Sequence, residues 1–152
     1  MAASVEPPAQ FIVDEISPSY WRVTFENGPV NLIDADSIEQ LAYLVTRIEE
    51  SPAVTVVVFD SANPEYFMAH WDLKADRARV AAMAPGLTGL HPYLDNLVRL
   101  SKVPAVTISA IRGWARGAGS EFALATDIRV AGDSAILCHF EVDLGSVDGG
   151  YP

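Results

Sequence analysis

The chain has 152 residues, of which half are hydrophobic and a fifth are charged. This length allows one domain with a sizeable core, and the hydrophobic content excludes a disordered chain. Twenty acidic and ten basic side chains give a formal net charge of −10, which disfavours nonspecific binding to nucleic acid or to an anionic membrane surface.

The only cysteine, Cys138, excludes an internal disulfide and favours a reducing compartment. The first ten residues lack both the basic and the apolar region of a secretory signal. No apolar run approaches the roughly 20 residues that span a bilayer. We therefore expect a cytoplasmic protein that binds neither a membrane nor nucleic acid.

The start of the chain differs in composition from the rest. Residues 1–9 are small, polar and proline-bearing, which is typical of a flexible tail. Residues 10–152 are expected to form one core domain. This domain begins with two strands, 11–16 and 20–25, on either side of a turn rich in serine and proline.

A long amphipathic helix is expected next. Its apolar residues recur at helical spacing over residues 38–48, Asp34 or Asp36 is placed to cap its start, and a Ser-Pro pair ends it. The following strand, residues 54–59, is an unbroken run rich in β-branched side chains. Such a run predicts burial on both faces of a sheet.

The second half of the chain continues to alternate strands with helices. The expected elements are a short apolar segment at 66–68, helices at 74–83, 93–100 and 120–126, and strands at 106–110, 128–131 and 135–138. A glycine-rich turn separates the strand at 106–110 from the helix at 120–126. This alternation predicts an α/β layered architecture.

The glycine-rich turn, residues 113–119 (GWARGAG), is the segment most suggestive of chemistry. Each of its three glycines would cost about 1 kcal/mol inside a helix, so they indicate positive φ angles or a close backbone approach. Tight packing of a strand against a helix would explain them equally well. The segment matches neither a P-loop, nor G-x-G-x-x-G, nor the G-x-S-x-G elbow. Backbone N–H groups at a helix start can stabilise developing negative charge, and Glu121 and Glu141 are nearby candidates for proton transfer.

Residues 103–132, VPAVTISAIRGWARGAGSEFALATDIRVAG, resemble the signature of the crotonase superfamily, the enoyl-CoA hydratase/isomerase family. In that family a strand entered at a proline leads into G-x-A-x-G-G-G-x-E, an apolar helix and an Asp-Ile strand. Residues 67–73 (FMAHWDL) resemble the family's upstream loop F-x-A-G-A-D-[IL]. Asn31 is in register with an early asparagine, and residues 140–142 resemble P-E-[IV]. The resemblance covers nearly the whole chain.

The resemblance implies an α/β fold, a spiral of β-β-α units, without the C-terminal helices of the much longer family members. It implies an acyl-CoA substrate whose thioester oxygen lies in an oxyanion hole of two backbone N–H groups, those of Trp71 and Ala118 by position. The substrate-binding residues it implies are Met68, Ala69, His70, Asp72 and Gly117. It also implies a homo-oligomer, a trimer or hexamer. No metal and no cofactor are implied, apart from the coenzyme A of the substrate.

Glu121 and Glu141 match the two glutamates of the hydratase branch, so the implied reaction is reversible hydration of a 2-enoyl-CoA. We assign Glu121 as the base that activates water and Glu141 as the acid that protonates the α-carbon. Because two close carboxylates do not both ionise easily, one of them is expected to keep its proton. Two other interpretations stay open: Glu121 complements a helix dipole, and Glu141 is a solvated loop residue.

Several residues depart from the family pattern. His70 and Trp71 replace a small Gly-Ala pair, which either reshapes the acyl pocket or impairs it; His70 is a candidate proton carrier or a packing residue. Phe140 and Asp148 replace prolines, and Asp143 replaces an apolar residue, which would be unfavourable if buried. The alternatives are another enolate reaction (isomerisation, hydrolysis, decarboxylation or dehalogenation), or a catalytically silent homologue or fragment.

Overall fold

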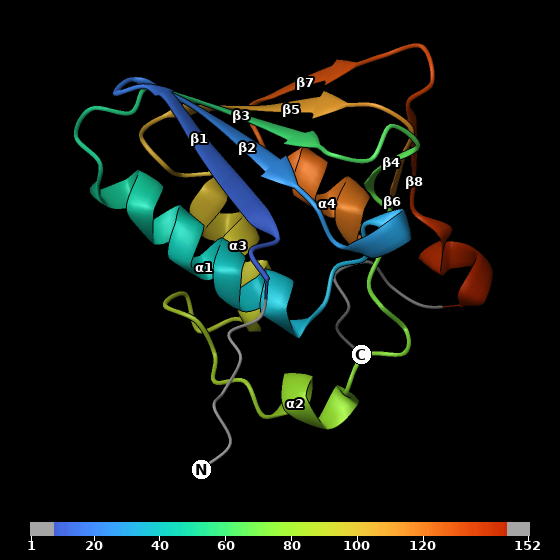
Figure 1. Cartoon of the computed structure of the whole chain (residues 1–152). Helices are drawn as coiled ribbons and strands as arrows, with labels where there is room; N and C mark the ends of the chain where they lie inside the picture. The colour runs from blue at the N-terminus through green and yellow to red at the C-terminus, as the bar shows by residue number, and fades with distance from the viewer. Residues whose placement is uncertain (1–7, 146–152) are drawn as a thin grey trace.

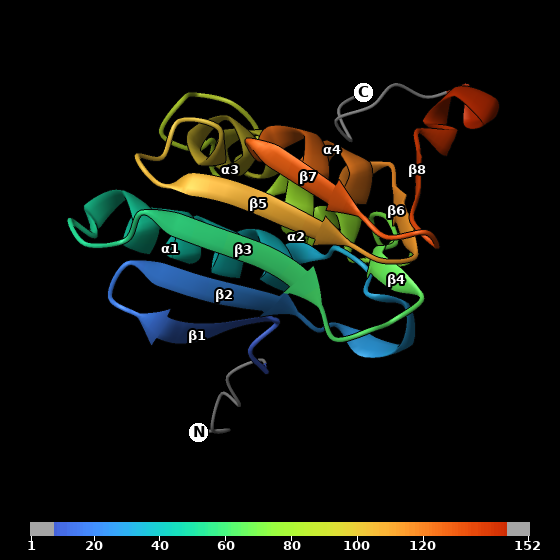
Figure 2. The same ribbon diagram turned by 90° about the horizontal axis from the view of Figure 1, so that it is seen from above.

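A computed structural model of the chain describes residues 8–145. The larger of its two sheets has the strand order β1-β2-β3-β5-β7 and is antiparallel only between β1 and β2. Its strands are β1 (Phe11–Ser17), β2 (Tyr20–Phe25), β3 (Val56–Ser61), β5 (Val106–Ile111) and β7 (Ile128–Ala131). Figure 2 shows them side by side in this order.

The smaller sheet is parallel throughout and has the order β4-β6-β8. Its strands are β4 (Tyr66–Met68), β6 (Trp114–Arg116) and β8 (Ile136–Cys138). Each follows one parallel strand of the larger sheet along the chain: β4 follows β3, β6 follows β5, and β8 follows β7. A helical segment comes next in every case, so the expected spiral of β-β-α units is confirmed.

The helical segments lie mainly on one side of the larger sheet. The helices are α1 (Ala35–Glu50), α2 (Arg77–Ala81), α3 (Pro92–Leu100) and α4 (Ala118–Ala125), and the 3-10 helices are η1 (Gly28–Val30) and η2 (Phe140–Leu144). Figure 1 shows α1, α3 and α4 packed beneath the same face of that sheet. The predicted alternation of strands and helices therefore yields a layered α/β fold.

Asp34, rather than Asp36, caps helix α1. Its carboxylate accepts a hydrogen bond from the backbone N–H of Ser37 at 2.9 Å, and the Ser37 hydroxyl accepts one from the N–H of Asp34 at 3.1 Å. This reciprocal pair satisfies two N–H groups that have no partner within the helix. Burial alone would raise the pKa of Asp34, but hydrogen bonds from Ser37, Asn27 and Gln10 outweigh it and lower the pKa.

Two elements differ from the sequence expectation. The helix expected at 74–83 spans only Arg77–Ala81. Asp76 caps its start, and its carboxylate accepts a hydrogen bond from the N–H of Ala78 at 2.9 Å. Among its residues 78–81, only Val80 is even half-buried, so little packing supports a longer helix. The expected glycine turn instead contains β6, because β4 and β8 pair with it on both sides.

The expectation that β3 is buried on both faces is wrong for the described part of the chain. Val57 and Phe59 are fully buried, whereas Val56 and Val58 are half-exposed. Since α1, α3 and α4 lie on one face (Figure 1), the other face of β3 is left partly open to solvent. Of the predicted tail at residues 1–9, residues 1–7 lie outside the described residues, as does Asp148.

The hydrophobic core is centred on Phe122 of α4. Its ring is fully buried and lies 5.1 Å from the ring of Phe59, 6.3 Å from that of Phe67 and 6.5 Å from that of Phe11, measured between centroids. Aromatic pairs at these separations add to the free energy gained from burial. Phe122 thus anchors α4 to strands β1, β3 and β4.

Replacing Phe122 by alanine should lower the free energy of unfolding by about 3–5 kcal/mol, because it removes the ring at the centre of this core. Urea denaturation measures the loss. The matched control is Leu124→Ala on the same helix, where the side chain is 56% exposed and the cost should stay near or below about 0.5 kcal/mol. Equal costs for the two variants would contradict this description of the core.

Because Asp34 caps α1 with a charged carboxylate, its contribution to the free energy of unfolding should depend on pH. A carboxylate whose pKa is lowered by folding stabilises the fold fully above its unfolded pKa, and this contribution disappears as the pH falls through the folded value. Asp34→Ala should therefore cost about 1 kcal/mol at neutral pH, and the difference should shrink as the pH falls below the ordinary value of 3.8 toward the lowered pKa of the folded state. Asp133→Ala, at an exposed turn, is the control; a cost independent of pH would refute the role of the charge.

Candidate active site

The start of helix α4 approaches the end of strand β4 so closely that no side chain fits between them. A Cβ atom at Gly119 would lie 2.0 Å from the carbonyl oxygen of Met68, far inside contact distance. Only glycine permits this approach. The segment that follows Met68 and the first turn of α4 are therefore held against each other.

Asn31 organises the segment that continues from β4. It is buried and has φ of 51°, a left-handed conformation that asparagine tolerates better than most residues. Its side-chain amide donates to the Ser61 hydroxyl at 2.7 Å and to the Phe25 carbonyl at 3.2 Å. Its own carbonyl accepts from the N–H of Ala69 at 2.9 Å. One residue thus connects the ends of β2, β3 and β4.

The backbone of residues 69–72 lies parallel to residues 31–33, and this sets the direction of the Trp71 amide. Ile33 donates to the His70 carbonyl at 2.9 Å and accepts from the N–H of Asp72 at 2.8 Å. In such a bridge the residue between the two bonded groups points its own N–H to the opposite side. Within residues 8–145, the Trp71 N–H has no hydrogen-bond acceptor.

Ala118 presents the second amide of interest. It is the first residue of α4, so its N–H has no carbonyl partner inside the helix. Gly117 precedes it with φ of 48° and ψ of −121°, and the Gly117 carbonyl accepts from the N–H of Glu121 at 2.9 Å. Such an amide, at the positive end of a helix, is suited to an anionic oxygen.

The carboxyl group of Glu141 lies on Gly117. A Cβ atom at Gly117 would lie 1.9 Å from Oε1 of Glu141, so the absence of a side chain makes room for this carboxyl group. Its Oε2 is buried and has no hydrogen-bond partner among the described residues. A buried carboxyl oxygen without a partner is costly unless a ligand or water supplies one.

Two further contacts join the segments that carry Glu121 and Glu141. Gly117 donates from its N–H to the Cys138 carbonyl at 2.9 Å, and the Ser120 hydroxyl lies 3.2 Å from Nε2 of His139. These contacts place η2 beside the first turn of α4. Sequence reasoning did not single out Ser120 or His139, because no motif links a serine to a histidine 19 positions later.

Some of the predicted substrate-binding residues have buried side chains. Met68 and Ala69 are buried, so any contact they make with a ligand in this arrangement is through the main chain. Asp72 is half-buried, and its carboxylate accepts from the N–H of Lys74 at 2.8 Å. Asp143 is exposed, so its charge carries no burial cost.

His70 contacts an aromatic ring, as one of its two interpretations requires. Its ring meets that of Phe140 edge-on at 5.5 Å between centroids, and its Nδ1 lies 2.6 Å from the Trp71 carbonyl oxygen. Because a carbonyl only accepts, Nδ1 carries the proton. The guanidinium of Arg116 lies over the rings of Trp114 and Phe140, so an aromatic and cationic cluster borders Glu141.

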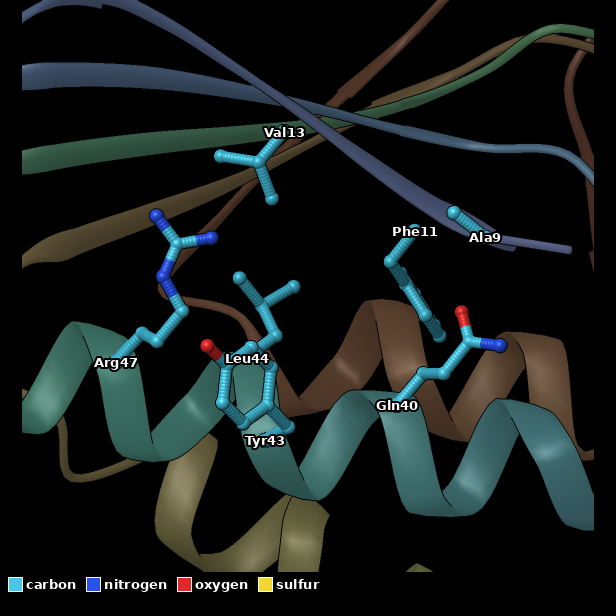
Figure 3. A pocket seen from close by; sticks show the side chains of 7 residues that line it. All are labelled: Ala9, Phe11, Val13, Gln40, Tyr43, Leu44 and Arg47. Carbon is cyan, nitrogen blue, oxygen red and sulfur yellow. The ribbon is translucent and has the colours of Figure 1, made fainter. Parts of the chain in front are cut away.

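A separate hollow of about 430 Å³ lies between β1 and α1. Its lining includes Phe11, Val13, Gln40, Tyr43, Leu44 and Arg47, and Figure 3 shows these side chains. Two of its polar side chains already have partners: Arg47 pairs with Glu15, and Gln40 accepts from the N–H of Gln10. It shares no residue with the candidate active site.

Within residues 8–145, no three His, Cys, Asp or Glu side chains are grouped so that they could hold a metal ion. The helices in that same part of the chain are too short or too polar to span a membrane.

The sequence profile of the enoyl-CoA hydratase/isomerase family matches residues 15–152. The chain belongs to this family. The resemblance to the crotonase superfamily is thereby confirmed. Among its relatives is carnitinyl-CoA dehydratase of Proteus mirabilis, which is 32% identical over 129 residues, covering 85% of this chain and 48% of that protein.

Solved structures of the family share the fold. A Streptomyces avermitilis protein provisionally described as an enoyl-CoA hydratase superimposes with a TM-score of 0.86 at 29% identity, covering 93% of this chain and 53% of that chain. The enoyl-CoA hydratase of Bacillus anthracis gives 0.79 at 27% identity, covering 93% and 54%. This chain therefore spans about half the length of the relatives that it matches.

The position of Glu141 predicts different effects at two glycines with positive φ. Gly28→Ala, with φ of 66° and no atom within 4 Å of the added Cβ, should cost about 1 kcal/mol from backbone strain alone. Gly117→Ala should cost more, because it also displaces the Glu141 carboxyl group. The ¹³C resonance of that carboxyl should move only in Gly117→Ala. An unmoved resonance would mean that the carboxyl group does not rest on Gly117.

Proposed function

We propose that this site binds an acyl-CoA thioester and supports the reversible hydration of a 2-enoyl-CoA. The observation that carries the proposal is the position of Glu141: its carboxyl group lies beside Gly117, and its buried Oε2 has no hydrogen-bond partner among residues 8–145. The next residue, Ala118, begins a helix, so its N–H has no carbonyl partner within that helix. The carboxyl group that we propose as proton donor thus lies beside the residue that precedes the proposed oxyanion donor.

In the proposed reaction, the thioester oxygen accepts hydrogen bonds from the N–H groups of Trp71 and Ala118. Water attacks the β-carbon and gives a proton to Glu121. The π pair of the C=C bond then forms the Cα=C bond of an enolate, as the carbonyl π pair moves onto the thioester oxygen. Glu141 then gives its proton to the α-carbon. Each oxyanion donor of this kind contributes about 3 kcal/mol of transition-state stabilisation.

The name of one relative supports the reaction class. Carnitinyl-CoA dehydratase, which is 32% identical to this chain, is named for loss of water from a coenzyme A thioester, the reverse of hydration. We propose the same class here with no cofactor beyond the coenzyme A of the substrate. The trimer or hexamer and the cytoplasmic location stay predictions.

Glu121→Gln and Glu141→Gln should each reduce crotonyl-CoA hydration about 10²- to 10⁴-fold, because each removes a group that moves a proton. The assay follows loss of the ultraviolet absorbance of the conjugated thioester. Glu50→Gln at the exposed end of α1 is the matched control and should keep the full rate.

Calorimetric titration with crotonyl-CoA and with free coenzyme A accompanies this assay. Binding without turnover in the unchanged chain would favour a catalytically silent binding protein. Full hydration rates in both glutamine variants would reject the assigned roles. Turnover of a β,γ-unsaturated thioester but not of crotonyl-CoA would point to isomerisation.

A further inference from the structure

Tyr93, on helix α3, reaches from outside the candidate site to the residue that begins α4. Its side chain is 5% exposed, and its hydroxyl donates a hydrogen bond to the carbonyl oxygen of Ala118 at 2.5 Å. The two residues are 25 positions apart, and the bond joins two helices. Within a buried environment such a bond is costly to break, because both groups lose their partner.

The peptide units on both sides of Ala118 are therefore held. The Gly117 carbonyl, in the unit that contains the Ala118 N–H, accepts from the N–H of Glu121 at 2.9 Å. The carbonyl of Ala118 itself accepts from Tyr93. Fixing the two planes that flank one Cα restricts both of its dihedral angles, and with them the direction of the N–H.

Tyr93 also lies near a proposed catalytic carboxylate. Burial first, and then the negative charge of Glu121, raise the pKa of Tyr93 well above its ordinary value. The hydroxyl therefore stays protonated at physiological pH. It acts as a permanent hydrogen-bond donor and does not take part in proton transfer.

Hydrogen bonds to α1 hold helix α3, which carries Tyr93, in place. The side-chain amide of Asn96 donates to the Ile38 carbonyl of α1 at 2.8 Å. Arg99 donates to the carboxylate of Glu49 at 2.6 and 3.1 Å and to the Thr46 hydroxyl at 2.7 Å. These side chains are anchored to α1, so Tyr93 is part of a packed pair of helices.

We propose that Tyr93 is a positioning residue for the oxyanion hole: by bonding the Ala118 carbonyl, it holds the Ala118 N–H in the direction that stabilises an enolate. The inference rests on the proposed function, because it concerns the same amide. It adds a residue that lies on α3 and makes no contact with the reacting atoms. Tyr93 thus acts on the transition state and not on the coenzyme A portion of the substrate.

The test compares Tyr93→Phe with Tyr43→Phe. The first change removes only the hydroxyl and keeps the buried ring; the second makes the same change on α1, where Tyr43 is 69% exposed. The probe is acetoacetyl-CoA, a thioester that ionises to an enolate with its own ultraviolet absorbance and is not hydrated. Its affinity for each variant is measured beside that of free coenzyme A.

We expect Tyr93→Phe to weaken the binding of acetoacetyl-CoA about tenfold, which equals about 1.4 kcal/mol, and to shift its ionisation to higher pH. The affinity for free coenzyme A should change less than twofold. For crotonyl-CoA, kcat should fall while KM stays nearly constant. Tyr43→Phe should change none of these values. Equal enolate affinity in Tyr93→Phe and the unchanged chain would overturn the inference.

Amide hydrogen exchange gives a readout that needs no ligand. In Tyr93→Phe, the amide of Glu121, which donates to the Gly117 carbonyl at 2.9 Å, should exchange faster, while those of α1 keep their rates. If the unchanged chain fails to bind acetoacetyl-CoA, the proposed function fails, and the exchange rates alone decide whether Tyr93 holds α4. Unchanged exchange at the Glu121 amide would refute the positioning role in every case.

Discussion

The close contact between Gly119 and the Met68 carbonyl is the constraint on which the candidate site depends. A methyl group at Gly119 would lie 2.0 Å from that oxygen, so any other residue would push α4 away from β4. The amides of Trp71 and Ala118 come from the two segments that meet here. The absence of one side chain thus brings together the two segments that carry the donors of the proposed oxyanion hole.

Two kinds of interaction keep this contact in place. Phe122, three residues after Gly119, packs with the rings of Phe59 and Phe67 and pulls α4 onto the strands. The side-chain amide of Asn31 bonds the ends of β2 and β3, and its backbone carbonyl bonds the segment that follows β4. Apolar burial supplies most of the free energy, and the buried amide determines which arrangement is adopted.

Most of the helices and strands could be predicted from the sequence, because each is determined by residues that are neighbours along the chain. The alternation of apolar residues placed α1 and the strands, and the Ser-Pro pair predicted the end of α1. Strand β6 was missed, since its three residues are in a strand only through pairing with β4 and β8. Burial on one face of β3 was missed because it depends on where the helices pack.

The candidate site also combines features that the sequence predicted with features that it did not. Glu121, Glu141 and the glycine turn were found because their motifs lie close together along the chain. The carboxyl group of Glu141 beside Gly117, and the bond from Tyr93 to Ala118, join residues 24 or 25 positions apart, and no pattern in the sequence encodes them. Contacts of this kind depend on the packing of α3, α4 and η2 against one another.

The repeated order of strand, strand and helix has a consequence for how such a site diversifies. Trp71 lies in the unit that begins with β3, Ala118 and Glu121 in the unit of β5, and Glu141 in the unit of β7. In the proposed site, each β-β-α unit contributes its own component. A different reaction would then require changes in only one unit, while the other units keep the proposed oxyanion hole.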